Sequence, residues 1–278
     1  MKQNKAYKFR IYPNEKQKII FAKTFGCTRF IYNKMLSDKI DYYQQTKQRL
    51  NNTPAQYKIE FEWLKEVDSL ALANAQMNLQ KAFTNFFTNP KSGFPKFKSK
   101  HKNRKSYTTN NQRNTITLKN GYLKLPKLVD LVRVKQHRQI SKDHKIKSVT
   151  ISQTPSGKYY ASILCEYESQ IQPIESKTFL GLDFSMKELY VASNNTSAEY
   201  PRYFRKSQER LAREQKKLSK CVIGSQKRNK QRLKVAKLHE KVANQRKDFL
   251  HRLSRQIANT YDCVCIEDLD MKAMSQAL

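Results

Sequence analysis

The segments FLGLD (residues 179–183) and CVCIE (residues 263–267) decide the fold expected for the last third of the chain. Each is a short apolar run that ends in one acid, Asp183 or Glu267, and the two acids are 84 positions apart (267 − 183). Short apolar runs predict buried strands, and a strand end holds a carboxylate at a sheet edge. The residues between them are rich in lysine and arginine. Two fixed carboxylates beside a basic surface indicate a divalent metal held against a phosphodiester.

Each acid also has an ordinary structural explanation. Asp183 could cap the turn that follows its strand, and Glu267 with Asp268 and Asp270 could begin a helix, whose N-terminus favours acids. For either acid taken alone, this explanation is the better one. The order strand, basic helices, strand favours a metal site, because metal-dependent nucleases gather carboxylates from different elements.

Charge dominates the composition of the 278 residues. Lysine and arginine number 55 against 23 aspartates and glutamates, which gives a formal charge of +32 and a pI near 10.0. Such a protein repels itself unless a polyanion neutralises it, so nucleic acid is the expected partner. RNA packaging and association with an anionic membrane are the alternatives. No segment has the roughly 18 apolar residues that span a bilayer. The N-terminus also lacks the apolar region of a signal peptide. We therefore expect a cytoplasmic, nucleoid-associated protein with no membrane partner and no small-molecule substrate.

Cysteine and histidine spacing indicates no zinc site. The cysteines are odd in number and form no CxxC pair, and no HExxH occurs. We expect reduced, mostly buried thiols. They are Cys27, Cys165, Cys221, Cys263 and Cys265.

The first 175 residues predict a small β-barrel with inserted helices. Residues 6–12 alternate as a strand, and Asn14 with Gln17 is a plausible helix cap. Helices are expected at 14–25, 28–46 and 69–88, with Gly26 interrupting the first pair. Further strands are expected at 115–118, 122–125, 131–135, 145–153 and 158–167, and a linker at 169–177. Beyond it we expect strands at 179–183, 189–192 and 263–267, with basic helices at 202–220 and 225–260.

Residues 90–106 form a basic segment with Phe94 and Phe97 interleaved and without acids. One interpretation is a solvated, mobile loop with no binding function. A loop that follows phosphates while its aromatics stack on bases is the functional one. The expected nucleic-acid contacts are Lys96, Lys98, Lys100 and Arg104 here, and Arg205, Arg228, Lys230 and Arg232 on the basic helices.

Several motifs resemble those of one family. GLDFSMK (181–187) and IEDLDMKAM (266–274) resemble the first and second RuvC motifs of TnpB, a family of transposon-associated RNA-guided nucleases related to type V CRISPR effectors. NQRKDFLH (244–251) is similar to the helix before the second motif. YKFRIYP (7–13), GFPKFK (93–98) and LKLPK (123–127) resemble the family's opening strand and wedge segments. The resemblance covers essentially all 278 residues.

The resemblance implies a mixed α+β fold. Residues 1–175 would form a wedge (WED) β-barrel with an inserted helical recognition (REC) lobe at about 14–88. Residues 176–278 would form part of an RNase H-like (RuvC) α/β domain. The family binds a transposon-derived guide RNA and uses it to open and cut double-stranded DNA beside a short flanking motif. The residues expected to contact that motif are Ser69, Leu70, Ala73, Tyr107, Asn110 and Asn111, with an ordinary polar turn as the alternative.

Asp183 and Glu267 match two of the family's three metal-binding acids. The implied cofactor is therefore Mg²⁺ at a two-metal site, incomplete here. The third acid and the four-cysteine zinc finger would lie beyond residue 278, so no zinc is expected and the chain is expected to be cleavage-deficient through truncation. The alternatives are a nuclease-inactive RNA-guided repressor and a non-specific RNA-binding protein. The chain retains both Asp183 and Glu267, which argues against the repressor. Competition between a transposon-end RNA and unrelated RNA at ~0.15 M salt would distinguish a guide-binding protein from a non-specific RNA-binding protein.

Overall fold

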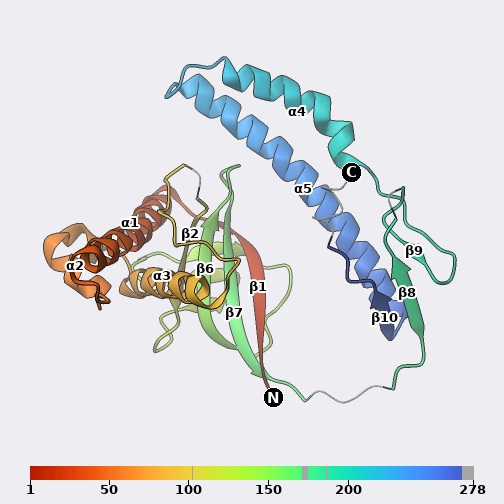
Figure 1. The fold of residues 1–278 in the computed structure, drawn as a ribbon, viewed down its shortest axis with the longest axis horizontal. Helices are drawn as coiled ribbons and strands as arrows, with labels where there is room; N and C mark the ends of the chain where they lie inside the picture. Colours follow the sequence, from red (N-terminus) through yellow and green to blue (C-terminus); the bar gives the residue numbers. More distant parts are fainter. Residues whose placement is uncertain (102, 171–174, 186, 271–278) are drawn as a thin grey trace. The chain divides into compact units, whose positions relative to one another are not determined.

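The computed structural model describes residues 1–101, 103–170, 175–185 and 187–270. The chain divides into two compact units, Met1–Gln170 (unit 1) and Ile171–Leu278 (unit 2), drawn in Figure 1. The boundary expected at 175 and 176 lies just beyond this division. The expected linker at 169–177 and the end of the second motif, at 271–274, fall partly or wholly outside the described residues.

Unit 1 is built on a curled seven-stranded antiparallel sheet of order β2-β6-β7-β1-β5-β4-β3 (Figure 1). Strand β1 curls the sheet because it pairs with β7 along most of its length and with β5 at its end. The strand order leaves β2 and β3 as edges, so the sheet is a half-barrel where a closed barrel was expected. The strands are β1 (Lys2–Tyr12), β2 (Lys105–Asn110), β3 (Thr117–Lys119), β4 (Tyr122–Lys124), β5 (Val132–Lys135), β6 (Lys145–Gln153) and β7 (Tyr159–Glu168).

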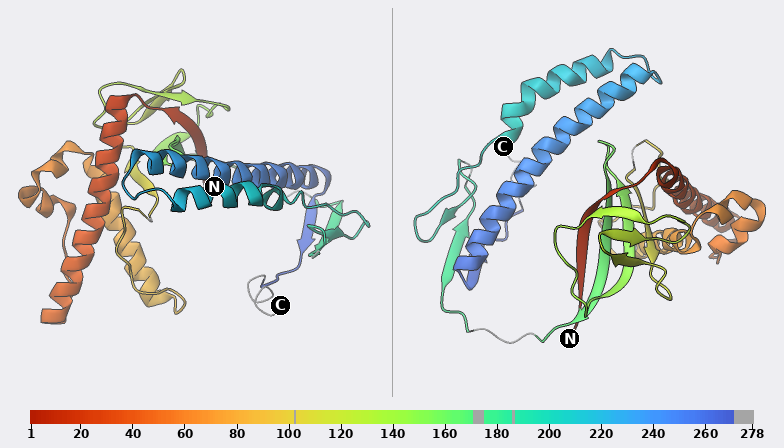
Figure 2. Two further views of the ribbon diagram at one scale, coloured as in Figure 1. Left: turned by 90° about the horizontal axis from the view of Figure 1, so that it is seen from above. Right: turned by 180° about the vertical axis from the view of Figure 1, so that it is seen from behind.

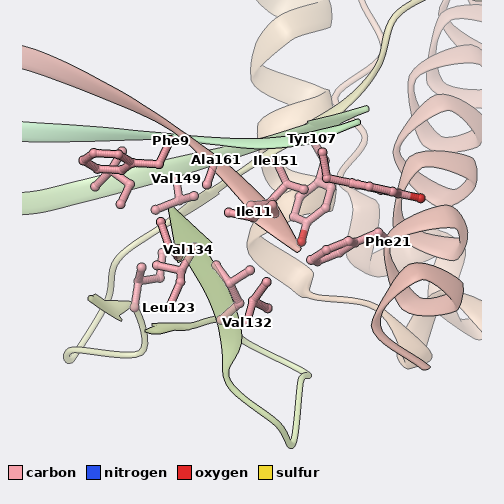
Figure 3. Close-up of a cluster of buried hydrophobic side chains, with 14 of the residues drawn as sticks. Phe9, Ile11, Phe21, Tyr107, Leu123, Val132, Val134, Val149, Ile151 and Ala161 are labelled. Carbon is pink, nitrogen blue, oxygen red and sulfur yellow. The ribbon is translucent and has the colours of Figure 1, made fainter. Parts of the chain in front are cut away.

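The concave face of this sheet carries the main core of unit 1 (Figure 3). Alternate residues of β1 point inward, and Phe9 and Ile11 are almost completely buried. Phe21, from the helix that follows β1, and Tyr107, from β2, pack together with ring centroids 6.3 Å apart. The period of two along the strands therefore explains which side chains form the core.

The helices of unit 1 lie between β1 and β2 in sequence. They are α1 (Glu15–Thr46), α2 (Pro54–Glu60), the 3₁₀ helix η1 (Glu62–Glu66) and α3 (Ser69–Thr88). Asn14 and Gln17 form the expected capping box at the start of α1. The interruption expected at Gly26 is wrong, because α1 runs through it without a break. A second buried cluster, which includes Ile31, Leu36 and Leu72, holds these helices together.

Strand β2 was not expected from the sequence. Its residues are mostly polar, yet Tyr107 and Thr109 face inward, and the Thr109 hydroxyl donates to the Asp68 carboxylate at the start of α3. Asn120 and Gly121 form the turn between β3 and β4, and both residues have positive φ, as a type I′ hairpin turn requires.

Unit 2 combines a three-stranded sheet with a helical hairpin (Figures 1 and 2). Its elements are β8 (Phe179–Asp183), β9 (Val191–Ala192), α4 (Tyr203–Ser219), α5 (Gln226–Thr260) and β10 (Cys263–Ile266). The sheet order is β10-β8-β9, and α4 packs along α5. The expectation that both apolar runs are buried strands is wrong, because Ile266 of β10 is 75% exposed, and in β8 only Leu180 is buried while Phe179 is 63% exposed.

The cysteines and the helices bear on two further expectations. Cys27 and Cys165 are buried, while the other three thiols are partly or fully exposed, so the expectation of mostly buried thiols is wrong. All five are free thiols. In the part of the chain that the structure describes, no helix is both long enough and apolar enough to cross a bilayer.

Candidate functional site

The two acids that the sequence singled out lie at the same edge of the unit 2 sheet. Strands β8 and β10 are parallel, and their register pairs Leu182 with Ile266, each directly before one of the acids. Asp183 and Glu267 therefore occupy neighbouring positions at the carboxyl ends of adjacent strands. Both side chains are exposed.

A hydrogen-bonded clamp at the opposite end of these strands fixes that register. The Asp262 carboxylate accepts from the backbone N–H groups of Lys177 and Thr178, both at 3.0 Å, and from the Thr178 hydroxyl at 2.9 Å. The Thr178 carbonyl in turn accepts from the N–H of Cys263 at 3.0 Å. The hydrogen bonds from Lys177 and Thr178 lower the pKa of the Asp262 carboxyl. Sequence analysis missed Asp262 because its partners lie 84 and 85 positions away.

The donor set at this edge fits a hard divalent cation in part. Carboxylates such as those of Asp183 and Glu267, which directly follow the last paired residues of two parallel strands, offer oxygen ligands of the kind Mg²⁺ prefers. Within the described ranges, no group of three or more histidine, cysteine, aspartate or glutamate side chains is placed to hold a metal ion. Two carboxylates are fewer oxygen ligands than a bound divalent cation takes, so this edge alone would not complete a site.

The helical hairpin presents lysines and arginines around one buried acid. Glu214 of α4 is 7% exposed. Its carboxylate accepts from Gln231 of α5 at 2.7 Å and pairs with Lys234 at 3.0 Å and Lys217 at 3.3 Å. The hydrogen bonds from Gln231 and Lys234 lower the pKa of Glu214 to about 2. Glu214 therefore stays ionised near neutrality and links the two helices.

The four arginines and lysines predicted on this hairpin have different environments. The guanidinium of Arg228 donates to the carbonyls of Leu218 and Cys221, both at 3.0 Å, and so closes the turn after α4. This structural engagement does not support Arg228 as a phosphate contact. Arg205, Lys230 and Arg232 are exposed.

Arg205 lines a hollow of about 440 Å³ within unit 2. Phe184, the residue that follows Asp183, also lines this hollow. The same hollow holds Arg246, whose guanidinium carbon lies 5.8 Å from the centre of the Phe204 ring. Glu188 also lines it. Its arginines would attract an anion beside the carboxylate edge.

A basic hollow of about 320 Å³ in unit 1 gathers α1, α3, the basic loop and β2. No aspartate or glutamate occurs between Ser69 and Val129, so α3, the loop and β2 contribute no acid to it. Its lining residues include Arg29, Asn74, Asn78, Lys98, Lys100, Arg104 and Lys105. Asn74 and Asn78 were not predicted from the sequence. Their positions one turn apart on α3 would have indicated a shared face.

The basic loop is anchored to α1. Asn33 accepts from the backbone N–H of Lys98 at 2.8 Å and donates to its carbonyl at 2.9 Å. The Lys98 ammonium lies 3.7 Å from the centre of the Tyr32 ring. Burial lowers the pKa of Lys98. Lys98 therefore packs on an aromatic, while Lys96, Lys100 and Arg104 are exposed, as free phosphate contacts would be.

Two residues expected to contact DNA beside the flanking motif have structural roles. The Tyr107 ring is 8% exposed and packs on Phe25, and burial raises its pKa. Asn111 donates to the Ile146 carbonyl at 3.0 Å and accepts from the N–H of Ile116 at 3.0 Å. These positions do not support base contacts from either side chain. The remaining four, Ser69, Leu70, Ala73 and Asn110, are exposed or half-buried.

Comparison with family models gives two matches. Residues 162–278 match a model described as "Probable transposase", and residues 1–48 match one described as "Helix-turn-helix domain". Over residues 1–48 the structure has one strand and one long helix, β1 and α1.

Comparison with curated proteins gives relatives that match over nearly the whole chain. A protein of Streptomyces pristinaespiralis named "Putative RNA-guided DNA endonuclease" is 32% identical over 96% of this chain and 67% of its own length. The Escherichia coli K12 protein "Putative RNA-guided DNA endonuclease InsQ" is 30% identical over 100% of this chain and 69% of its own length.

A solved structure shares the fold. It is titled "Cryo-EM structure of the Cas12f1-sgRNA-target DNA complex" and matches 97% of this chain and 82% of its own with a TM-score of 0.57 and 13% identity. The fold and these matches define the class as transposases of the RNA-guided endonuclease type. The chain belongs to the TnpB family, the OrfB proteins of IS605-type transposons.

Proposed function

We propose that this chain binds a transposon-derived guide RNA and a double-stranded DNA target as part of an RNA-guided DNA endonuclease. The observation that carries the proposal is the parallel pairing of β8 with β10, whose last pair, Leu182 with Ile266, directly precedes Asp183 and Glu267. The net charge of +32 and the family membership support nucleic acid as the partner.

In this proposal, unit 1 is the wedge sheet with the recognition helices inserted, and unit 2 is the first part of a RuvC-like nuclease domain. The basic hollow of unit 1 is the proposed contact with the DNA beside the flanking motif. Asn78 has an exposed amide that can read base edges, and Arg104 and Lys105 can neutralise phosphates, while the Asn74 amide donates to the Leu70 carbonyl at 2.8 Å.

Asp183 and Glu267 are the proposed ligands of Mg²⁺ in this chain. A magnesium ion bound there would stabilise negative charge that develops on a phosphodiester. The contribution of the chain itself is to hold two oxygen ligands on neighbouring strands, in a register set by the Asp262 clamp. Because the described residues bring no third ligand to this edge, no cleavage step is assigned to them.

RNA preference tests the binding half of the proposal. The labelled transposon-end RNA is bound to the purified 278-residue protein at ~0.15 M salt and challenged with unrelated RNA of equal length. We expect the unrelated RNA to compete poorly, because the proposed guide binding distinguishes one RNA from another. A protein that binds by charge alone would show little preference among RNAs of equal length. Equal competition would contradict guide binding and identify a general RNA-binding protein.

A cleavage assay tests the metal half. A polypeptide of these 278 residues, with guide RNA and matching DNA in Mg²⁺, should bind the DNA without cutting it, because two carboxylates are too few for a two-metal site. Guide-directed cutting by this polypeptide that is lost in Asp183→Asn would show that two ligands suffice and overturn the expectation.

A further inference from the structure

Four phenylalanines at the end of α3 and the start of the basic loop form one exposed aromatic cluster. Phe94 lies edge-on to Phe83 and Phe86, with ring centroids 5.7 and 5.4 Å away. Phe87 lies 5.1 Å from Phe86 and 6.5 Å from Phe83. We name these four residues the phenylalanine platform. Phe83 packs against the buried cluster of the helices, so the platform stands on a fixed base.

The platform remains open to solvent. Phe87 is 66% exposed and Phe94 is 46% exposed. Rings of this size are usually covered, and a contiguous exposed apolar group marks a binding surface more often than a single exposed side chain does. Because the rings hold one another by edge and stacking contacts, little side-chain freedom would be lost when a ligand binds.

The charge around the platform indicates what binds there. The guanidinium carbon of Arg49 lies 5.6 Å from the centre of the Phe87 ring. Lys81 and Lys91 are exposed on the same stretch of chain, which has no acid from Ser69 to Val129. A ligand that suits this surface needs flat apolar faces and negative charge together. Unpaired nucleotides have both, and base stacking on aromatics beside cations is how proteins hold single strands.

We propose that the phenylalanine platform binds the unpaired bases of a single-stranded nucleic acid, with Arg49 beside its phosphates. This proposal takes from the proposed function only that the partner is a nucleic acid. It does not involve Asp183 and Glu267. A guide RNA loop and an opened DNA strand would offer the same chemistry.

The test compares strands that differ only in their bases. Binding of a purine-rich single-stranded DNA and of an abasic strand of the same length is measured by fluorescence anisotropy, with a matching RNA in a parallel arm. The full chain should prefer the base-bearing strand by roughly 5- to 100-fold. The double variant Phe87→Ala/Phe94→Ala should lose this preference and keep its affinity for the abasic strand. A stronger loss for RNA or for DNA identifies which strand occupies the platform.

Two further variants keep the test decisive. Tyr122→Ala, at a ring that is also 46% exposed and outside the platform, should leave the preference unchanged. Phe87→Leu keeps apolar bulk without an aromatic face, so it should lose the preference while retaining the melting temperature.

Three outcomes would overturn the proposal. They are an unchanged preference for the base-bearing strand in the double variant, an unchanged preference in Phe87→Leu, or a Phe87-dependent self-association that leaves strand binding intact. These outcomes are separable from a failure of guide-RNA preference, which is read in the RNA competition alone.

Discussion

The two units stabilise their sheets in different ways. Unit 1 buries large side chains such as Phe9, Phe21 and Leu72 in two clusters. In the part of unit 2 that the structure describes, few hydrophobic residues are buried. They are Leu180, Ala192, Leu211, Val235 and Val242. Polar contacts of Asp262 and Glu214 connect its strands and helices. Unit 1 should therefore resist changes of pH and salt, whereas unit 2 should respond to both.

The largest expected effect comes from emptying the core of unit 1. Phe9→Ala should lower the free energy of unfolding by about 3–5 kcal/mol, because Phe9 is completely buried. Urea unfolding followed by circular dichroism measures it. Val129→Ala, at a fully exposed side chain, is the control and should change stability by less than about 0.5 kcal/mol. A similar small effect of Phe9→Ala would show that unit 1 does not depend on this core.

Removing the clamp of unit 2 should loosen the edge that carries the two acids. Asp262→Asn leaves a neutral acceptor for three hydrogen bonds, so exchange of the Thr178 and Cys263 amides should accelerate by roughly tenfold. Hydrogen exchange read by NMR checks this. Asp248→Asn removes only an exposed pair with Arg252 and should leave those amides unchanged. Equal exchange in both variants would remove the clamp from the explanation of the register.

Acid should weaken the helical hairpin through Glu214. The hydrogen bonds from Gln231 and Lys234 lower the pKa of Glu214 from its ordinary value of 4.5 to about 2 in the folded chain. A group whose folded pKa is lowered stabilises above its unfolded pKa, so this contribution is complete above pH 4.5 and decreases as the pH falls toward 2. An NMR titration of the carboxyl carbon gives the pKa directly. A midpoint near 4.5 would contradict the structure, and Glu214→Gln should flatten this part of the pH dependence.

The smallest expected effect is on the salt dependence of nucleic-acid binding. Lys230→Gln and Arg232→Gln should each reduce the slope of log K against log salt by about 0.7 on a single strand. Arg228→Gln should instead lower the thermal stability of the hairpin, because its guanidinium closes the turn. If Arg228→Gln changes the slope and the other two variants do not, the assignment of these residues is reversed.

Sequence patterns predicted the elements whose signal is local. The bounds of α3, α4 and α5 and the strand at β8 follow from apolar periodicity, and Asn14 with Gln17 marked the start of α1. The mixed fold of α and β elements was predicted correctly, whereas the sheet of unit 1 was predicted as a small β-barrel and is an open half-barrel. Whether a sheet closes depends on pairings between distant strands, which no local pattern shows.

The failures have physical reasons. Gly26 costs a helix only about 1 kcal/mol, which the packing of its neighbours in α1 offsets. Strand β2 was missed because its buried Thr109 is polar and is satisfied by Asp68, 41 positions away. The packing of Lys98 on Tyr32 was missed because the two residues lie far apart in sequence. Tertiary contacts of this kind leave no local pattern.

Paramagnetic broadening by Mn²⁺ tests most directly whether Asp183 and Glu267 act together. In NMR spectra of the 278-residue protein, low Mn²⁺ should broaden the amides of β8 and β10 at Leu182 and Ile266 together, and either Asp183→Asn or Glu267→Gln should abolish both effects. Broadening confined to Asp268 and Asp270, or broadening of one strand that survives loss of the other strand's acid, would contradict a shared site.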